Sequence, residues 1–524
     1  MAISSIAATV FAILLGFVVL SYVRSSTQTR RVRGHLPPGP PPKWIVGNLF
    51  DFPLAKPWET YRRWAEEYGD VVHLDLPVKP IVMLGSLKAA NDLLDKRSQI
   101  YSDRPQSVML ELLSFGWAFS TMPYGSLWRT CRKHFHEHFN QSIVRHQHST
   151  TQLQESRALL KRILFTPELA RQHIRSLPGS SIIKVVYGTR DASRTDTYVR
   201  LAETALDAAR KASVPGAFMA ELLPFLRHIP SWLPGGNARR FSEKYRPSVC
   251  EMRDKPFDEV QAAMAAGKTI PCVAYNLIRQ LQDAHGTQEL TAEQDTVARI
   301  VTAVAYAGAA DTTTASIESF VLAMGLYPEV QRKAQVELDR VVGPSRLPDF
   351  NDLESLTYVK AVVLETLRWM PAVPLGIPHS LTTDDECNGY HLPKGTILMV
   401  NAWAMMKNPE DYPDPDDFKP ERFLDAEGNI NPDVRDPRTI AFGFGRRICP
   451  GSDFAISLLS ICIASMLHVF EIKAGTDESS QPVVLTAEGC SEAISSPLMF
   501  PRHIVPRSAQ AERLIRDVVV ECED

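Results

Sequence analysis

A single cysteine between a glycine-rich turn and a long apolar run constrains this chain more than any other feature. It lies in AFGFGRRICPGSDFAISLLS, residues 441–460. The surrounding glycines let the backbone turn tightly and lie flat beneath a large planar group. Pro450 suits the first position of a helix, and the apolar residues 454–467 predict that this helix is buried. A thiolate at a helix N-terminus is stabilised by the helix dipole, so Cys449 is either a reactive ligand or a buried structural cysteine.

The N-terminus carries an uncharged segment long enough to cross a membrane. Residues 1–23 contain no charged side chain, and roughly 20 helical residues span the hydrocarbon layer. A cleaved signal peptide fits less well, because no basic residue precedes the apolar run and no clear small-residue cleavage site follows it. The arginines at positions 24, 30, 31 and 33 place the following side in the cytosol. We expect one retained transmembrane helix, residues 1–23, with the rest of the chain on the cytosolic face.

Composition excludes several other classes of protein. Lys and Arg number 57 against 60 Asp and Glu, a net charge of −3, so no basic field favours nucleic acid as a partner. The eight cysteines lie far apart and form no CxxC pair, which argues against a zinc site or a disulfide scaffold. This pattern fits a reducing compartment.

The order of sequence patterns predicts one large, mainly α domain with a small β portion. Residues 24–45 are basic and then proline-rich, which indicates a stiff linker. Helical patterns dominate from about residue 55 to 380, and Thr291 with Gln294 forms a capping-box pair before a long helix. Short strand-like pieces come late. We assign residues 46–506 to the globular domain and 507–524 to a helical C-terminal tail.

Five motifs together resemble the cytochrome P-450 superfamily. The segment FGFGRRICPG matches the haem-binding pattern F-x-x-G-x-R-x-C-x-G of that family. Four further segments, WRTCR, GAADTT, ETLR and PERF, match its other motifs in the family order. The matching positions are Trp128, Arg132, Asp311, Thr312, Glu365, Arg368, Arg422, Phe442, Gly445, Arg447, Cys449 and Gly451. With the anchor and the proline-rich linker, the resemblance covers nearly the whole chain.

The resemblance implies the cytochrome P-450 fold and a bound haem b (iron protoporphyrin IX). Cys449 would be the axial ligand of the iron, and an axial thiolate donates electron density that favours O–O cleavage. Phe442 and Gly451 would flank the ligand in the haem-binding loop. Buried propionates need cationic or hydrogen-bonding partners, and Arg447 lies beside the ligand.

Trp128 and Arg132 are four residues apart on one helix face, so both could reach a propionate.

The same resemblance assigns roles to two further groups of residues. Thr312 would hydrogen-bond dioxygen at the haem, and Asp311 would supply protons from solvent. The small apolar residues before them make exposure of this part of the helix unexpected. Glu365 and Arg368, three apart on a helix, would form a pair that Arg422 joins, and we interpret this triad as structural.

Three positions depart from the common family pattern. Ala309 stands where a second glycine is usual, which narrows the groove for oxygen. His379 stands where arginine often pairs with a propionate; a neutral histidine can still donate one hydrogen bond, but the pairing becomes pH-dependent. Met406 stands where histidine or arginine is frequent, which puts one haem contact in doubt.

These observations predict a membrane-anchored haem-thiolate monooxygenase that inserts one oxygen atom of O2 into a neutral hydrophobic molecule. The chain looks most like the fungal secondary-metabolite branch, including enzymes similar to O-methylsterigmatocystin oxidoreductase, so a terpenoid, polyketide or aromatic substrate is expected. The chain contains no flavin or nicotinamide motif, so we expect electrons from NADPH-cytochrome P-450 reductase, with cytochrome b5 as an additional partner. We also expect the chain to span the endoplasmic reticulum membrane once and to contact its lipids. Two alternatives remain: a haem-thiolate isomerase or dehydratase that needs no O2, and a non-catalytic haem sensor.

Overall fold

The computed structural model describes residues 36–519, apart from positions 45, 54, 77–78, 215, 269–270, 287–288, 477–480 and 482. The predicted transmembrane helix, residues 1–23, and most of the predicted linker lie outside the described residues. The described chain divides into two compact units. The first contains the described residues up to Pro105, with Leu375–Ala404 and Phe444–Arg446; the second contains Gln106–Pro374, Met405–Gly443 and the chain from Arg447 onward.

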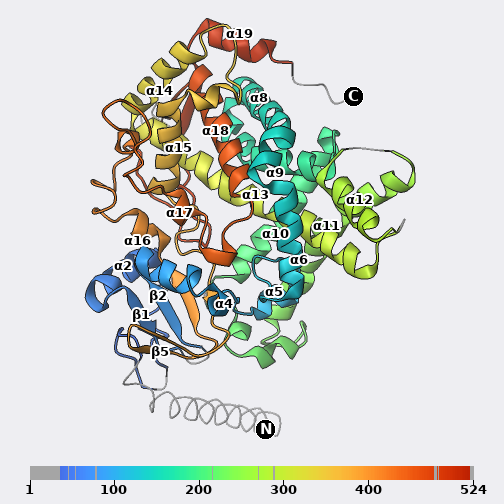
Figure 1. Ribbon diagram of the computed structural model, residues 1–524, viewed down its shortest axis with the longest axis vertical. Helices are drawn as coiled ribbons and strands as arrows, with labels where there is room; N and C mark the ends of the chain where they lie inside the picture. Colours follow the sequence, from blue (N-terminus) through green and yellow to red (C-terminus); the bar gives the residue numbers. More distant parts are fainter. Residues whose placement is uncertain are drawn as a thin grey trace. The chain divides into compact units, whose positions relative to one another are not determined.

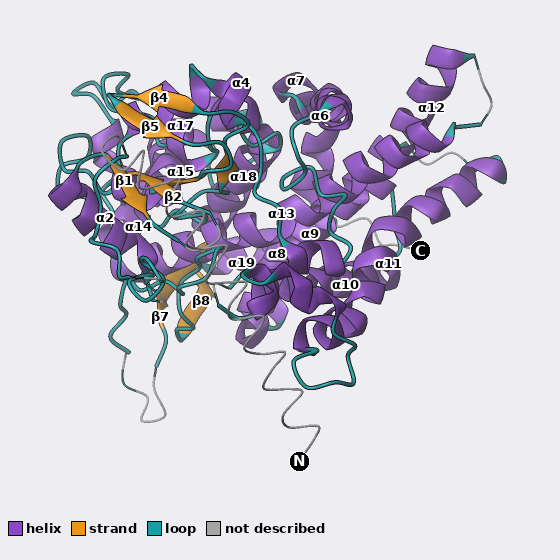
Figure 2. Cartoon of the chain, turned by 90° about the horizontal axis from the view of Figure 1, so that it is seen from below, coloured by secondary structure: helices purple, strands orange, loops and turns teal. Residues whose placement is uncertain are grey.

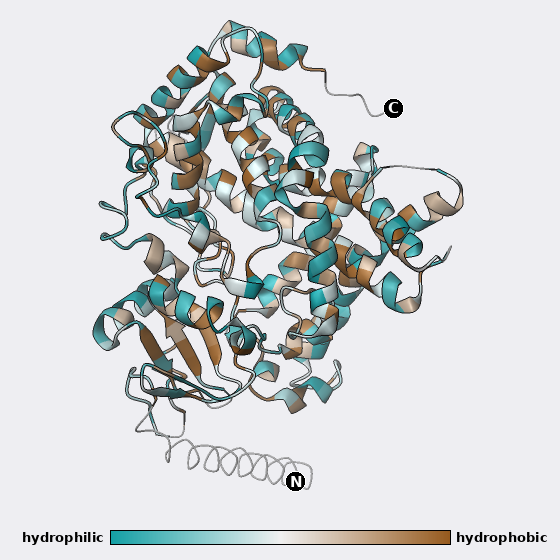
Figure 3. Ribbon diagram, viewed as in Figure 1, coloured by the Kyte–Doolittle hydropathy of each residue, from teal (hydrophilic) through white to brown (hydrophobic). Residues whose placement is uncertain are grey.

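A four-stranded sheet forms the centre of the first unit (Figure 1). The strands lie in the order β1 (Val71–Leu74), β2 (Ile81–Leu84), β6 (Ile397–Val400) and β3 (His379–Ser380). Only the β2–β6 pair is parallel. Strands β1, β2 and β6 are mostly apolar, as Figure 3 shows, and side chains from them pack with Tyr61 of helix α2 into a separate small core. The unit also contains α2 (Pro57–Tyr68), α3 (Leu87–Ala90), η2 (Asn91–Asp95), α4 (Ser98–Tyr101) and the hairpin of β4 (Asp385–Cys387) with β5 (Tyr390–Leu392).

The second unit is almost entirely helical, as Figure 2 shows. Its longer helices are α6 (Ser126–Phe139), α8 (Ser149–Phe165), α9 (Ala170–Tyr187), α10 (Ala192–Ala212), α11 (Asn237–Ala265), α12 (Val273–His285), α13 (Ala292–Leu326), α14 (Pro328–Val341), α15 (Thr357–Trp369) and α18 (Ser452–Val469). Shorter helices are α5 (Val108–Leu112), α7 (Gln141–Ile143), α17 (Arg438–Ala441) and α19 (Ala509–Asp517), while α16 (Ala402–Met406) joins the two units. One antiparallel pair, β7 (Phe470–Ala474) and β8 (Arg502–Pro506), completes it. The mainly α class with a small β portion is confirmed.

Helix α13 is the long helix predicted from the capping-box pair. The side chain of Thr291 accepts from the backbone of Gln294, and the Gln294 side chain accepts from the Thr291 N–H, so both signals act as expected. The helix runs for 35 residues and packs against α6, α9, α11, α12 and α18. Because it is covered on most sides, its apolar residues form no single stripe.

Helix α18 follows the cysteine loop and is buried, as the apolar run predicted. It begins at Ser452 with Gly451 as N-cap, so Pro450 lies in the preceding turn and the predicted start was two residues early. Among the described residues it is the one helix long and apolar enough to cross a membrane. Since 67% of it is buried inside the protein, it is a core helix in this structure.

The C-terminal tail is helical over α19, as expected. Ala511 and Ile515 are its buried residues, and the helix packs against α8 and α18. Ser508 caps its N-terminus by accepting from the Ala511 N–H. The described part of the tail therefore packs against the helical unit.

Candidate active site

The loop that carries Cys449 joins α17 to α18 through a tight turn. The backbone N–H of Cys449 donates to the carbonyl of Phe442 at 2.7 Å. Gly443 and Gly445 have φ of 79° and 54°, in the left-handed region that favours glycine. A Cβ on Gly445 would lie 2.0 Å from the carbonyl oxygen of Leu94. The path of this loop therefore requires the glycines that the sequence places there.

Cys449 lies partly buried just before α18. Burial raises the pKa of its thiol above the ordinary value, and the carboxylate of Asp453 acts in the same direction. The backbone N–H of Gly451 and the charge of Arg132 lower it. The net effect disfavours a free thiolate, and a cation bound to the sulfur would remove that penalty.

Arg132, on α6, carries a positive charge that lowers the pKa of the Cys449 thiol. Burial lowers the pKa of its guanidinium, while the neighbouring Cys449 raises it. Within the described part of the chain, its side chain makes no hydrogen bond and no ion pair with a carboxylate. A partly buried guanidinium in this situation offers a binding position for an anionic group.

The side chains of Trp128 and Arg447 lie against each other. Trp128 is one helical turn before Arg132 on α6, and Arg447 belongs to the loop that carries Cys449. The Arg447 guanidinium is 4.4 Å from the centre of the Trp128 ring. Its two terminal nitrogens donate to the backbone carbonyls of Phe119 and Met122 at 3.0 and 2.8 Å. The indole N–H of Trp128 also donates to Phe119, at 3.0 Å. These hydrogen bonds fix the segment before α6 to the loop that carries Cys449.

The expectation that Trp128 donates to a propionate stays a prediction. An indole has a single donor, and in this structure that donor bonds to the Phe119 carbonyl. The physical reason is a tertiary contact: the chain just before α6 brings a carbonyl to the buried ring, which helical spacing alone does not reveal. The role predicted for Arg132 stays a prediction, and its guanidinium is available for it.

His379 belongs to the first unit, on strand β3. Its Nδ1 lies 2.8 Å from the carbonyl of Tyr101, and a carbonyl only accepts, so the neutral ring carries its proton on Nδ1. Donation from Nε2 as well would require the protonated ring. In this structure the Nδ1–H of neutral His379 bonds to Tyr101, and its role toward a propionate stays a prediction.

The middle of α13 is more accessible than the rest of the helix. Gly308 is exposed and residues 309–312 are partly exposed, whereas the helix is mostly buried before and after them. A Cβ added to Gly308 would meet no atom within 4 Å. Small side chains leave the helix backbone uncovered at Gly308, while the Asp311 side chain, which was not expected to be exposed, is 11% exposed. The result is an accessible window in a buried helix.

Thr312 lies at this window. Its hydroxyl donates to the carbonyl of Gly308, four residues earlier, at 3.2 Å. The hydroxyl oxygen keeps acceptor capacity, and rotation of the side chain would redirect its one proton. Thr312 can therefore accept or donate a hydrogen bond at the window.

Asp311 is held by two arginines from neighbouring helices. Its carboxylate lies 3.0 Å from Arg210 of α10 and 3.7 Å from Arg175 of α9, and its side chain is 11% exposed. Arg210 also approaches Asp207 at 3.3 Å and Glu492 at 3.9 Å. Although burial lowers the pKa of Arg210, these carboxylates raise it above its ordinary value. Asp311 is thus a paired carboxylate at the edge of the window.

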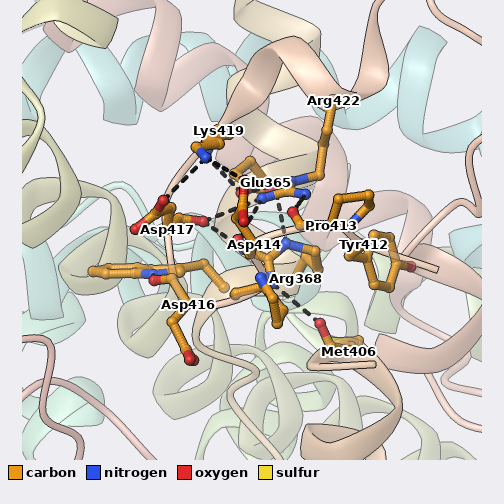
Figure 4. Close-up of polar contacts among 12 residues, drawn as sticks. Glu365, Arg368, Met406, Tyr412, Pro413, Asp414, Asp416, Asp417, Lys419 and Arg422 are labelled. Atoms are coloured by element: carbon orange, nitrogen blue, oxygen red, sulfur yellow. Dashed lines mark hydrogen bonds and ion pairs between the residues drawn. The ribbon is translucent and has the colours of Figure 1, made fainter. Parts of the chain in front are cut away.

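Glu365, Arg368 and Arg422 form the predicted triad (Figure 4). Arg368 donates to both Glu365 oxygens at 2.7 and 2.8 Å, and Arg422 donates to one of them at 3.1 Å. Glu365 and Arg368 are fully buried. Arg368 also donates to the carbonyl of Met406 at 3.1 Å, so the departure at Met406 leaves a backbone contact that any residue could supply. The network ties α15 to residues 406–422.

Comparison with known proteins agrees with this arrangement. The family model for Cytochrome P450 matches residues 37–489. Cytochrome P450 monooxygenase ple1 of Rhodocybe pseudopiperita is 40% identical over 93% of this chain and 92% of its own length. Cytochrome P450 monooxygenase COX1 of Coprinopsis cinerea is 37% identical over 96% and 98%, and tryptamine 4-monooxygenase of Psilocybe cyanescens is 35% identical over 95% and 98%.

The chain belongs to the cytochrome P450 family. Its relatives are fungal monooxygenases, and it is a haem monooxygenase of the fungal secondary-metabolite branch.

A P450 carries iron protoporphyrin IX, and the described residues fit this group. Cys449 is a thiol whose ionisation needs a cation, Arg132 is a cation that lacks an anion, and Gly308 and Gly451 have open space where a Cβ would point. The haem iron would bind the thiolate of Cys449, a haem propionate would pair with Arg132, and the flat ring would occupy the open space beside the glycines. Cys449, Arg132 and Gly451 are therefore the residues of this P450 that would hold its haem.

Sequence reasoning missed Arg175 and Arg210. No local spacing links them to Asp311, which lies 101 residues from Arg210. The one available signal was general: a carboxylate in a mostly buried helix requires a cationic partner somewhere in the fold.

Proposed function

We propose that this P450 is a membrane-anchored monooxygenase that acts on a neutral hydrophobic molecule with electrons from a separate NADPH reductase. The observation that carries the proposal is the Cys449 loop, whose turn requires its glycines, in a chain whose relatives are P450 monooxygenases. When bound, the haem would supply the activation of O2, with one oxygen atom transferred to the substrate and the other reduced to water.

The residues around Cys449 would stabilise negative charge on its sulfur and on a propionate. The Gly451 N–H and the Arg132 guanidinium both favour negative charge on the Cys449 sulfur. Arg132 would at the same time neutralise a propionate. Arg447 would keep the loop in place through its bonds to Phe119 and Met122.

The window residues would serve to move protons. The Thr312 hydroxyl donates a hydrogen bond to the Gly308 carbonyl in the structure, so the side chain would have to rotate before the hydroxyl could donate to another group. Asp311 would have to exchange an arginine contact for a proton from solvent, and its longer contact with Arg175, at 3.7 Å, is the weaker of the two. Release from Arg175 is therefore the expected first movement.

The family resemblance places residues 107–119 and 492–500 at the substrate pocket. The substrate is proposed to be uncharged because the acidic side chains in these two segments already have cationic partners. Glu111 pairs with Arg227 at 2.5 Å, and Glu492 lies 3.9 Å from Arg210. Phe115 and Trp117 stack with ring centres 5.7 Å apart and are buried. Terpenoids, polyketides and aromatics fit such a surface, and one relative, tryptamine 4-monooxygenase, is named for an aromatic substrate.

The proposed membrane location would place the chain in the endoplasmic reticulum through residues 1–23. The segment between α10 and α11 supports an additional contact with lipid. It exposes Met219, Phe225 and Trp232, the last at 78%, beside the cation Arg227. Aromatic and basic side chains together favour a bilayer interface.

The proposal is tested with the full chain co-expressed with an NADPH-cytochrome P-450 reductase. Reduced membranes exposed to carbon monoxide should show the red-shifted Soret band of thiolate ligation. Incubation with ¹⁸O2 and a panel of terpenoids, polyketides and aromatics should give a product that carries one labelled oxygen atom and requires NADPH. Omission or addition of cytochrome b5 then measures its contribution.

Cys449→His should lose both the red-shifted band and the labelled product, because imidazole donates less electron density than a thiolate. Cys250→Ser, a partly exposed cysteine on α11, is the matched control and should retain both. Conversion of a substrate without NADPH or O2 would instead support an isomerase or dehydratase. Spectral binding of panel compounds with no turnover would support a haem sensor.

A further inference from the structure

The first half of helix α11 carries basic side chains that the rest of the protein does not neutralise (Figure 1). Residues 237–247 contain four basic residues and one acidic residue, although the whole chain has a net charge of −3. The basic residues are Arg239, Arg240, Lys244 and Arg246. None of the four forms an ion pair with a carboxylate in the part of the chain that the structure describes. Their charge is therefore available to an external anion.

The position of these cations is unfavourable for the helix itself. Helix α11 begins at Asn237 and has no acidic residue in its first turn, where Arg239 and Arg240 lie. The N-terminus of a helix carries partial positive charge, so cations there cost free energy. Residues 251–259 of the same helix have the opposite balance, with four acidic residues against two basic ones. A local arrangement that opposes helix stability indicates a function.

The four cations form one basic surface on the outside of the helix. Arg240 and Lys244 are four residues apart on one face, and Arg239 and Arg246 are seven apart on the adjoining face. Arg240, Lys244 and Arg246 are exposed, and Arg239 is half-buried. Glu243, the one acidic residue of this half, lies between the two pairs. The buried residues of this half lie on another face.

Exposed apolar side chains lie beside this basic surface. In the segment before α11, Met219, Phe225 and Trp232 are 49%, 43% and 78% exposed. Arg240 donates twice to the carbonyl of Ser231, the residue before Trp232, at 3.0 and 2.6 Å. Large apolar side chains next to cations suit a bilayer interface, where rings enter below the headgroups and cations meet the phosphates.

Ring contacts hold the same segment to the helix. The centres of the Phe218 and Phe241 rings are 4.9 Å apart, and those of Phe241 and Tyr245 are 4.8 Å apart. The Lys244 amine lies 4.9 Å from the centre of the Tyr245 ring. The apolar side chains and the basic surface would therefore meet a membrane together.

The combination selects one kind of partner. Free phosphate or an acidic protein would use the cations and leave the exposed apolar side chains in water. A neutral bilayer would take up the apolar side chains and leave the cations without counter-charges. A bilayer that contains anionic lipid satisfies both, and clusters of four or more Lys and Arg on a helix surface are typical of binding to such lipid.

We propose that the first half of α11 and the exposed side chains before it form a binding surface for anionic lipid. The phosphate and carboxylate groups of a lipid such as phosphatidylserine contact the four cations, while Phe225 and Trp232 lie in the interface. The inference rests on the proposed membrane location and adds the charge of the lipid to it.

The test uses the full-length holoenzyme in nanodiscs of phosphatidylcholine, with or without added phosphatidylserine. Hydrogen–deuterium exchange of residues 225–236 reports how firmly the segment is docked. Each Lys or Arg near an anionic surface strengthens binding about fivefold, so four cations opposed by Glu243 should slow exchange by roughly 10- to 100-fold when phosphatidylserine is present. High salt should reverse this slowing, because it screens exposed charges.

A triple variant, Arg239→Gln, Lys244→Gln and Arg246→Gln, removes the charge while keeping much of each side-chain stem. Arg240 is kept, because its bonds to Ser231 hold the segment before the helix. This variant should exchange like the wild type in phosphatidylcholine and show no slowing with phosphatidylserine. The matched control removes three exposed arginines from other helices and should behave like the wild type; these are Arg332, Arg340 and Arg513.

Two results would overturn the proposal directly. One is equal exchange of the wild type in the two kinds of disc, which would favour an acidic protein as the partner. The other is slowing by phosphatidylserine that survives in the triple variant. The carbon monoxide spectrum shows whether each variant is folded. If the triple variant is not, an undiminished lipid effect in the double variant Lys244→Gln and Arg246→Gln overturns the proposal.

Failure of the membrane anchor would give a different result. If alkaline carbonate releases the chain from the discs, the proposed transmembrane segment is wrong, and flotation of the same chain with lipid vesicles decides the inference. Binding to phosphatidylserine vesicles but not to phosphatidylcholine vesicles, lost in the variant, would support it. Any other flotation result would overturn it.

Discussion

Arg368→Met removes the one side chain that completes the buried network around Glu365. A guanidinium has five N–H groups, and each of those in Arg368 has an acceptor. Two go to the Glu365 oxygens at 2.7 and 2.8 Å. The other three go to the backbone carbonyls of Met406, Pro415 and Asp417 at 3.1, 2.7 and 3.0 Å. Methionine keeps an apolar stem of similar length and supplies none of these donors.

The size of the loss follows from what remains. Glu365 is fully buried and would retain the Lys419 N–H at 2.8 Å and the Arg422 Nε at 3.1 Å. Removing one partner of a buried ion pair costs about 3–5 kcal/mol. Arg368→Lys keeps the charge but offers only three N–H groups, so at least two acceptors lose their donor, for about 2–3 kcal/mol. The expected order of stability is wild type, then lysine, then methionine.

A pair with the same geometry but an exposed arginine is the matched control. Arg346 donates to both oxygens of Asp352 at 2.7 and 2.6 Å, but its side chain is 46% exposed. Arg346→Met should therefore cost only about 0–1 kcal/mol. The difference between the two methionine variants isolates the effect of burial.

The assay is urea unfolding followed by loss of the thiolate–carbon monoxide band. With a slope of about 1–3 kcal/mol/M or more, Arg368→Met should lower the midpoint by roughly 1–3 M, and Arg346→Met by a few tenths. Turnover per folded haem should be unchanged, because the triad is interpreted as structural. Equal midpoints for the two variants would refute the reasoning, and reduced turnover per haem at normal stability would show a catalytic role instead.

Four further predictions concern function and membrane location. Thr312→Ala should keep the carbon monoxide spectrum but divert consumed NADPH to hydrogen peroxide, since loss of a positioned proton donor costs on the order of 10²–10⁴-fold in its step; full coupling of NADPH to product would contradict this. Asp311→Asn should slow turnover with less peroxide, because the Thr312 hydroxyl remains; a peroxide yield equal to that of Thr312→Ala would speak against separate roles. Lys133→Glu, at an exposed position of α6, should slow the first electron transfer chiefly at low salt if α6 docks an acidic flavin domain, and a rate independent of ionic strength would exclude that site. Deletion of residues 1–33 should release most protein from membranes with haem retained, whereas persistence after alkaline carbonate washing would point to the exposed segment around Trp232.

Features set by neighbours in the chain could be predicted from the sequence. The capping box of Thr291 and Gln294 marked the start of α13, and the apolar run after Cys449 marked a buried helix. Glu365 and Arg368 pair because side chains three residues apart on a helix lie on the same face. The start of α18 was misplaced because Pro450 is compatible with both a turn and a first helical position.

What the sequence by itself determined is the chemistry of the site: a thiol in a loop that only glycines allow, a hydroxyl and a carboxylate on one helix, and cations for anionic groups. What only the tertiary structure decided is which partner each polar group meets. The Trp128 N–H bonds to Phe119, the neutral His379 bonds to Tyr101, and Asp311 is held by arginines of two other helices. The physical reason is that a buried polar group takes a partner within about 3 Å in space. Chain segments distant in sequence supply that partner, so spacing along the sequence carries no record of it.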